Sequence, residues 1–365
     1  MDGVETHSNE RGGMVEGRIQ VGVMGASGTV GSRLVAMLVD HPWFELVEVS
    51  ASERSEGARL AERMDADASS LPPALGELVL RATEGAWSAP LIFSALPSGI
   101  ARAVEPALAA RGHLVVSNAS AFRADPGVPL IIPEVNPDHL SLVGEQGHPE
   151  GGGLVTNPNC VVAGLAMALA PLHRSFGLEA VVATTFQAIS GAGRPGPSAL
   201  DIVDNMIPWI GGEEEKIAAE PRKILGDPGA PADFAVDATA TRVPVLHGHT
   251  VSVGVRLREP ATPEEARAAF ETFGRTARLG ELPSSPERIL AVTDQPDRPQ
   301  PRLDRDAGDG HGVTVGRIRR GEVMHLSFVV LAHNLVRGAA GAALLNAELC
   351  AARGMVASGT PTAAP

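Results

Sequence analysis

The stretch RIQVGVMGASGTVGSRLVAML, residues 18–38, decides the fold. Alternating Val and Ile over 18–24 predict a β-strand, and apolar residues at helical spacing over 29–39 predict a helix. Between the two lie three glycines in the spacing G-x-x-G-x-x-G: Gly25, Gly28 and Gly31. Glycines at a strand-to-helix turn let the backbone approach a pyrophosphate at the helix N-terminus. The turn predicts a dinucleotide-binding domain, with a purely structural turn as the alternative.

The residues after the second strand indicate which dinucleotide binds. A strand is predicted at 44–49, and the sequence SASERS follows it. NAD sites usually place an acid about 20 residues beyond the glycines, whereas NADP sites replace it with hydroxyls and an arginine. Ser52, Arg54 and Ser55 therefore favour NADP(H), although Glu53 would suit NAD and Arg54 could be a solvated surface charge.

Strands and helices alternate through the first part of the chain. Strands are predicted at 91–96 and 113–119, with a helix over 97–112 between them. This alternation predicts a parallel, doubly wound sheet, and the first domain extends to about residue 157.

After residue 157 the pattern changes to longer strands with few helices. Helices are expected at 262–273 and 335–352, and the proline-rich segment 295–312 is expected to be a long loop. The strand-like segments are 179–190, 240–246, 249–257, 312–320 and 323–334. The fold class is thus α/β: a Rossmann-like domain followed by an α+β domain with a mixed sheet.

Composition restricts the function classes. The chain has 365 residues, a formal net charge of −13 and two cysteines. An acidic protein lacks the basic surface that nucleic acid or an anionic membrane would require, and no apolar run approaches the length of a membrane span. Two cysteines make no disulfide framework, so we expect a cytoplasmic protein.

One of the cysteines is placed where a nucleophile would be. The sequence TNPNC ends at Cys160, and a helix is predicted over 161–176, so the thiol lies near a helix N-terminus. There the helix dipole and free amides would favour the thiolate, whereas Cys350 is expected to be an inert core residue. The partner base could be His247 or His249; no second cluster supports a metal site, and none is expected.

Ten motifs then occur in order across nearly all of residues 18–350. They are GASGTVG, FSALPS, VVSNASAFR, IPEVNPDH, TNPNC, QAISGAG, IPWIGGEEEKI, RVPVLHGHT, RPQPRLDRDAG and HNLVRGAAGAALLNAE. Together they resemble the aspartate-semialdehyde dehydrogenase family, in particular its archaeal and fungal-type branch.

The resemblance implies an oxidoreductase. It would use NADPH to convert 4-aspartyl phosphate reversibly to aspartate 4-semialdehyde and phosphate through a cysteine thioester, in lysine, threonine and methionine biosynthesis. The implied assembly is a homodimer or homotetramer. The expected divisions are a disordered tail at 1–17, an NADP-binding domain at 18–157 completed by the C-terminal helix 335–353, a catalytic and oligomerisation domain at 158–334, and a flexible tail at 354–365.

The resemblance also implies roles for individual residues. Cys160 matches the nucleophile and His249 the acid/base group, with Asn159 and Gln187 beside the reacting carbonyl. The substrate-binding residues would be Arg242 for the α-carboxylate, Glu213 for the amine, and Arg123 and Lys216 for the phosphate. The cofactor-binding residues, with the glycine turn included, would be Gly25, Ser27, Gly28, Thr29, Val30, Gly31, Ser52, Arg54, Ser55, Ser94, Pro97, Ser190, Gly191 and Asn334.

The chain departs from the family pattern at two places. Val161 and Val162 stand where Ser-Thr is usual, and Arg194 stands where Tyr is common. Related thioester reductases, such as malonyl-CoA reductase and N-acetyl-glutamyl-phosphate reductase, are the nearer alternatives, but Glu213 would repel malonate and has no role toward an acylated nitrogen. A non-catalytic dinucleotide-binding sensor is the alternative from another class.

Overall fold

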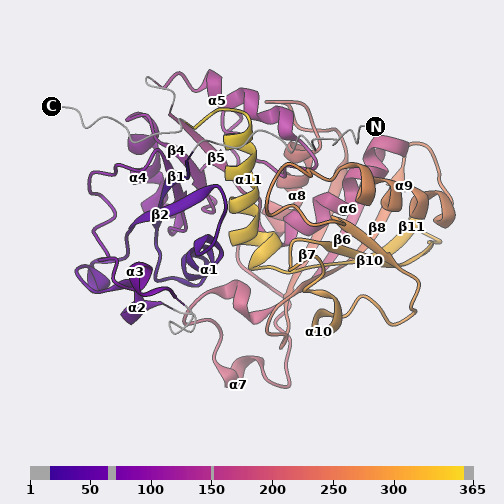
Figure 1. Ribbon diagram of the computed structural model, residues 1–365. Helices are drawn as coiled ribbons and strands as arrows, with labels where there is room; N and C mark the ends of the chain where they lie inside the picture. The colour runs from indigo at the N-terminus through magenta and orange to yellow at the C-terminus, as the bar shows by residue number, and fades with distance from the viewer. Residues whose placement is uncertain (1–16, 65–70, 149–151, 357–365) are drawn as a thin grey trace, which may run out of the picture.

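The computed structural model describes residues 17–64, 71–148 and 152–356 (Figure 1). The tails expected at 1–17 and 354–365 lie outside the described residues, except for Gly17 and 354–356. Within the described part of the chain, no helix is long and apolar enough to cross a membrane.

The first sheet is parallel throughout, as the alternation of strands and helices predicted. Its strand order is β2-β1-β3-β4-β5. The strands are β1 (Ile19–Met24), β2 (Phe44–Val49), β3 (Leu91–Ser94), β4 (Leu114–Ser117) and β5 (Gly153–Thr156). Every residue of β3, β4 and β5 is buried, as expected for a parallel sheet covered on both faces.

Helices from both ends of the chain pack around this sheet. They include α1 (Thr29–Leu38), α4 (Ser98–Ala109) and the C-terminal α11 (Gly341–Ala352), which follows a π-helical turn at Val336–Ala340. All residues of α11 up to Cys350 are buried, and Leu345 lies in the same core cluster as Val21 and Phe93. Figure 1 shows α11, in yellow, between the first sheet and the second half of the molecule. The shorter helices are α2 (Leu60–Arg63), α3 (Pro73–Gly76), α5 (Ser141–Glu145), α7 (Ala199–Ile202) and α10 (Pro301–Asp304).

The second sheet is mixed, which confirms the expected α+β half. Its order is β7-β6-β8-β11-β10-β9, with β6–β7 and β9–β10 parallel and the remaining pairs antiparallel. The strands are β6 (Leu178–Gln187), β7 (Ala235–Arg242), β8 (His249–Leu257), β9 (Leu290–Thr293), β10 (Val313–Arg320) and β11 (Leu326–Ala332). The long helices of this half are α6 (Cys160–Phe176), α8 (Glu213–Ile224) and α9 (Pro263–Thr276).

The structure differs from the local expectations for this half at three places. The strand expected over 240–246 runs instead over Ala235–Arg242, and the backbone beyond it, which contains Pro244, is irregular. The short strand β9 was not predicted, and the loop expected over 295–312 contains the helical turn α10.

Candidate active site

A cavity of about 710 Å³ lies at the carboxyl ends of the first sheet's strands, where open α/β sheets bind their ligands. Segments that follow β1, β3, β4 and β5 line one side, and segments of the second half line the other. The residues expected in the site that line this cavity are Thr29, Val30, Pro97, Arg123, Asn159, Cys160, Gln187, Ser190, Gly191, Glu213, Lys216, Arg242 and Asn334.

The glycine turn has the geometry of a phosphate-binding loop. Gly25 has a φ of +74°, which disfavours any side chain, and the N–H of Gly28 donates to the Gly25 carbonyl at 3.0 Å. A Cβ on Gly31 would lie 2.1 Å from that carbonyl oxygen, so only glycine lets α1 begin this close to the loop. The turn therefore fits the pyrophosphate of a dinucleotide at the N-terminus of α1.

The other expected cofactor residues lie outside the cavity lining: Gly25, Ser27, Gly28 and Gly31 of the glycine turn, and Ser52, Arg54, Ser55 and Ser94. Ser52, Arg54 and Ser55 follow the carboxyl end of β2, around a 3₁₀ turn at Glu53–Ser55, with Ser52 and Arg54 exposed. Ser94 is the buried last residue of β3. The residues expected to contact the nicotinamide therefore line the cavity together. The three residues expected to select NADP lie outside it, beyond the edge strand β2 of the first sheet.

Cys160 is the first residue of α6, and its helix start is capped. The side-chain oxygen of Asn159 accepts a hydrogen bond from the N–H of Val161 at 3.0 Å, a typical N-cap interaction. Val161 and Val162 are both buried in the core of the second sheet. The departure from Ser-Thr at these positions therefore adds apolar packing to α6 and leaves the position of the thiol intact.

The structure separates the two candidate histidines. His249 Nε2 lies 3.1 Å from Cys160 Sγ, whereas His247 Nδ1 contacts the hydroxyl of Ser190 at 2.9 Å. The Ala188 N–H donates to His249 Nδ1 at 3.0 Å, so the neutral ring carries its proton on Nε2, facing the sulfur. A cationic ring would place a second N–H against that of Ala188, which disfavours imidazolium.

The thiolate expected at Cys160 is wrong for the free protein. Burial raises the pKa of the Cys160 thiol to about 12, and the Glu213 carboxylate adds to the shift, while Arg123 and Arg242 oppose it. Burial, together with the charge of Arg242, lowers the pKa of His249 to about 3. Both shifts favour the uncharged forms, a neutral thiol beside a neutral imidazole.

Alkylation measures this resting state directly. We expect the rate at which iodoacetamide modifies Cys160 to rise about tenfold per pH unit from pH ~7 to ~9.5, because only the thiolate reacts. A thiol of ordinary pKa, about 8.5, would approach a plateau near the upper limit. Mass spectrometry of the labelled peptide gives the rate. A rate that is already constant near neutral pH would show that the resting pair is thiolate and imidazolium.

The carboxylate of Glu213 organises the substrate side of the cavity. It accepts from Lys216 Nζ at 2.9 Å, from Asn159 Nδ2 at 2.9 Å and from Gln187 Nε2 at 3.3 Å. Burial alone would raise the pKa of Glu213, but the bonds and charge of Lys216 and the bonds from the two amides outweigh it and leave the pKa lowered. Glu213 is therefore an anion that faces the cavity and can receive an ammonium group.

Two buried arginines line the same cavity. Arg242, at the end of β7, donates to the Ala188 carbonyl at 2.7 Å, and Arg123 donates to the Asn118 carbonyl at 2.6 Å. A Cβ on Gly191 would lie 2.9 Å from His249 Cε1 and 3.1 Å from Arg242 Nη1. Only glycine lets the backbone pass this closely to both side chains, which explains the sequence SGAG here.

Some lining residues were not predicted. Gly338, in the π-helical turn, packs against Cys160: a Cβ there would lie 2.9 Å from Cys160 Cβ. Its neighbours Leu335 and Ala339 line the cavity too, as do Asn118, Ser120 and Ile210. The motif HNLVRGAAG contained the signal, because a glycine in a helical sequence indicates close packing. Arg194 is exposed and lines a neighbouring cavity of about 390 Å³.

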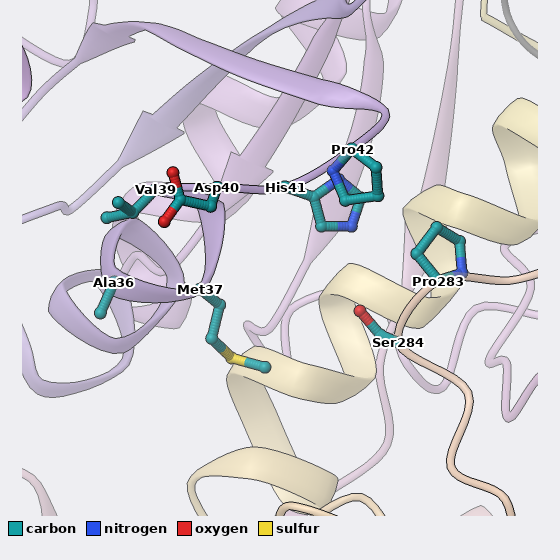
Figure 2. Close-up of a pocket in the computed structure, with 8 residues that line it drawn as sticks. All are labelled: Ala36, Met37, Val39, Asp40, His41, Pro42, Pro283 and Ser284. Carbon is teal, nitrogen blue, oxygen red and sulfur yellow. The ribbon is translucent and has the colours of Figure 1, made fainter.

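A separate cavity of about 450 Å³ lies at the far end of α1 (Figure 2). Figure 2 shows His41 and Pro42 on one side and Pro283 and Ser284 on the other. Its buried polar groups are paired: His41 Nε2 contacts Glu348 at 2.8 Å, and the N–H of Ser284 donates to the same carboxylate. This network connects α11 to the turn after α1 and includes no expected site residue. Among the described residues, no three His, Cys, Asp or Glu side chains are placed to hold a metal ion.

Comparisons with known proteins agree with this geometry. A family model described as "Semialdehyde dehydrogenase, NAD binding domain" matches residues 20–143, and one described as "Semialdehyde dehydrogenase, dimerisation domain" matches residues 169–337. The aspartate-semialdehyde dehydrogenase of Archaeoglobus fulgidus is 48% identical over 341 residues, which is 91% of this chain and 98% of the relative.

Solved structures give the same result. The crystal structure of aspartate semialdehyde dehydrogenase with NADP from Candida albicans matches with a TM-score of 0.85 and 36% identity, covering 93% of this chain and all of the other. The Vibrio cholerae aspartate semialdehyde dehydrogenase II complexed with ASA has a TM-score of 0.74 and 28% identity over 92% of this chain and 99% of the other.

Proposed function

The chain belongs to the aspartate-semialdehyde dehydrogenase family, and from that premise we propose that it converts 4-aspartyl phosphate reversibly to aspartate 4-semialdehyde and phosphate with NADPH. One observation carries the proposal: Cys160 lines a cavity together with Glu213, Lys216 and Arg242, and its Sγ lies 3.1 Å from His249 Nε2. A nucleophile, a proton donor, two cations and a carboxylate are the groups that this substrate requires.

The charges of the cavity match the charges of aspartyl phosphate. Arg242 offers a planar fork to the α-carboxylate, and Glu213 attracts the α-ammonium. Arg123 and Lys216 are the cations for the phosphate. Asn159 and Gln187, which both donate to Glu213, lie beside the reacting carbonyl.

Cys160 carries the covalent chemistry. Its sulfur attacks the acyl carbon, a thioester forms, and phosphate leaves toward Arg123 and Lys216. Because the resting thiol is neutral, its proton must be lost as the sulfur attacks. His249 can take that proton on Nε2 only by changing tautomer and giving up the bond from Ala188 N–H, a loss of about 1 to 3 kcal/mol. With its proton on Nε2, His249 donates to the sulfur that departs in the second half of the reaction.

The cofactor would be held between the two halves. The glycine turn with Ser27, Thr29 and Val30 would bind the pyrophosphate, and Ser52, Arg54 and Ser55 the 2′-phosphate. Bound NADPH supplies the hydride that reduces the thioester. Asn334 donates to the hydroxyl of Ser190 at 2.9 Å. These two residues, with Gly191 and Pro97, line the part of the cavity where the nicotinamide would bind, and we call them the nicotinamide wall. Ser94, at the end of β3, would support that wall.

The pathway, the domain limits and the assembly follow from the same premise. The product would serve lysine, threonine and methionine biosynthesis in the cytoplasm. The NADP-binding domain would comprise 18–157 and the C-terminal helix 335–353, and the catalytic domain 158–334. A homodimer or homotetramer would bury the outer face of the second sheet, where Val182 and Phe186 of β6 are 44% and 36% exposed.

Phosphate-dependent reduction of NADP⁺ by aspartate semialdehyde tests the proposal, with NADPH absorbance as the readout. We expect turnover that requires both phosphate and the aldehyde, and none in the reductive direction with malonyl-CoA. Glu213 explains the second expectation, because its carboxylate would repel malonate. Turnover with malonyl-CoA and none with aspartate semialdehyde would assign the chain to the alternative thioester reductases.

A further inference from the structure

Four charged residues lie along one face of α8: Glu213, Lys216, Glu220 and Lys223. Their spacing of three, four and three residues keeps them on a single stripe of the helix. Glu213 and Lys216 line the active-site cavity and have proposed roles toward the substrate. Glu220 and Lys223 have no role in the proposed reaction, and nothing in the sequence indicates one.

Glu220 joins the proposed phosphate ligand to the start of the nucleophile's helix. One carboxylate oxygen accepts from Arg123 Nη1 at 3.3 Å, and the other accepts from the backbone N–H of Asn159 at 2.6 Å. Glu220 is 6% exposed and Arg123 is 9% exposed, so solvent does not screen their interaction effectively. A carboxylate that bridges two elements in this way fixes the distance between Arg123 and Cys160.

Lys223 holds the loop on which Arg123 is placed. Its ammonium donates to three backbone carbonyls, those of Arg123 at 2.8 Å, Asp125 at 2.5 Å and Val128 at 2.6 Å. Three short bonds use all three donors of the ammonium group. Residues 123–128 are therefore attached to α8 one helical turn beyond the point where Glu220 contacts the guanidinium.

Arg123 keeps donors for a ligand. A guanidinium has five N–H groups, and the structure pairs Nη1 with Glu220 and Nη2 with Asn118. Its Nε is buried and has no hydrogen-bond partner among the described residues. A buried donor without a partner is uncommon in folded proteins, and this one remains available to a ligand.

We propose that Glu220 and Lys223 are positioning residues for Arg123. Glu220 fixes the guanidinium of Arg123, and Lys223 fixes its backbone. Helix α8 would then both bind the substrate, through Glu213 and Lys216, and hold Arg123 in position to bind the phosphate. This inference rests on the proposed function, because it assigns Arg123 to phosphate. Neither residue touches the substrate. Their effect must therefore reach the reaction through Arg123.

Glu220→Gln and Lys223→Met test the proposal in the phosphate-dependent direction. We expect each to raise KM for phosphate about 10-fold to 100-fold, the loss typical of a charge-assisted hydrogen bond, with KM for NADP⁺ nearly unchanged. Gln keeps the shape of Glu220 but cannot accept from both donors, and Met keeps the stem of Lys223 without its charge. Glu215→Gln and Arg222→Met are matched controls on the same helix; Glu215 is exposed and Arg222 donates to Ala232 instead.

A second measurement separates positioning from general support of the fold. In an Arg123→Met background, adding Glu220→Gln or Lys223→Met should change KM for phosphate little, because the group they position is gone. The proposal would be overturned if the second substitution raised KM for phosphate as much in the Arg123→Met background as in the wild type. An unchanged KM for phosphate in both single variants would overturn it too. If the wild type and the two controls show no phosphate-dependent turnover at all, the proposed function fails instead, so the two failures are distinguishable.

Discussion

Cys160→Ala is expected to abolish turnover in both directions, with kcat/KM falling by about 10⁴-fold or more. The reason is that the variant has no atom able to form the thioester, and the pocket that remains can only bind the substrate. Affinity for NADPH should be nearly unchanged, because the thiol contacts His249 and only borders the space proposed for the nicotinamide. Initial rates in both directions and a fluorescence titration with NADPH measure the two quantities.

The second cysteine provides the control for this experiment. Cys350 is fully buried at the end of α11, where burial raises the pKa of its thiol to about 12, and it is not among the residues that line the cavity. Cys350→Ala should retain turnover at nearly the wild-type level. Substantial phosphate-dependent turnover by Cys160→Ala would rule out the thioester mechanism.

His249→Asn should lower kcat by roughly 10²-fold to 10⁴-fold and change KM for the substrate little. Asn retains a donor of similar reach but cannot exchange a proton with the sulfur. The loss should therefore concern the reaction steps and not substrate binding, because the residues proposed to hold the carboxylate and the phosphate are Arg242, Arg123 and Lys216. Steady-state kinetics in the phosphate-dependent direction separate kcat from KM.

His247→Asn is the matched comparison, two residues away. His247 contacts the Ser190 hydroxyl at 2.9 Å and stacks on His333, with ring centroids 5.5 Å apart. It should affect the affinity for the cofactor more than kcat, because Ser190 belongs to the proposed nicotinamide wall. If His247→Asn proved the more damaging of the two for kcat, the proton-transfer role of His249 would have to be withdrawn.

Much of the first half could be predicted because its signals are local. The strand and helix around the glycine turn were placed within a residue of Ile19–Met24 and Thr29–Leu38, since alternation, helical spacing and glycine all act over a few positions. The helix that starts at Cys160 was predicted to within one residue, because a proline-containing turn precedes it.

Features that depend on distant contacts were missed. The pKa of Cys160 was expected to fall, but burial raises it. That burial could not be predicted, because it depends on how α6, β8 and the π-helical turn pack around the sulfur. Glu220 and Lys223 were not singled out in the sequence, since their partners lie about 60 to 100 residues away in the chain. The strand β9 exists because it pairs with β10, and its four residues give almost no periodicity of their own.

The position of α11 determines when the first sheet can complete its core during synthesis on the ribosome. Strands β1 to β5 have all emerged by Thr156, yet Leu345 and Cys350, which belong to their core, emerge roughly 190 residues later. At roughly 5–20 residues per second the delay is on the order of ten seconds. Throughout that interval the nascent chain exposes the apolar surface that α11 later covers. Its yield in a cell should therefore depend on translation speed and on chaperones that shield this surface, independently of the stability of the finished protein.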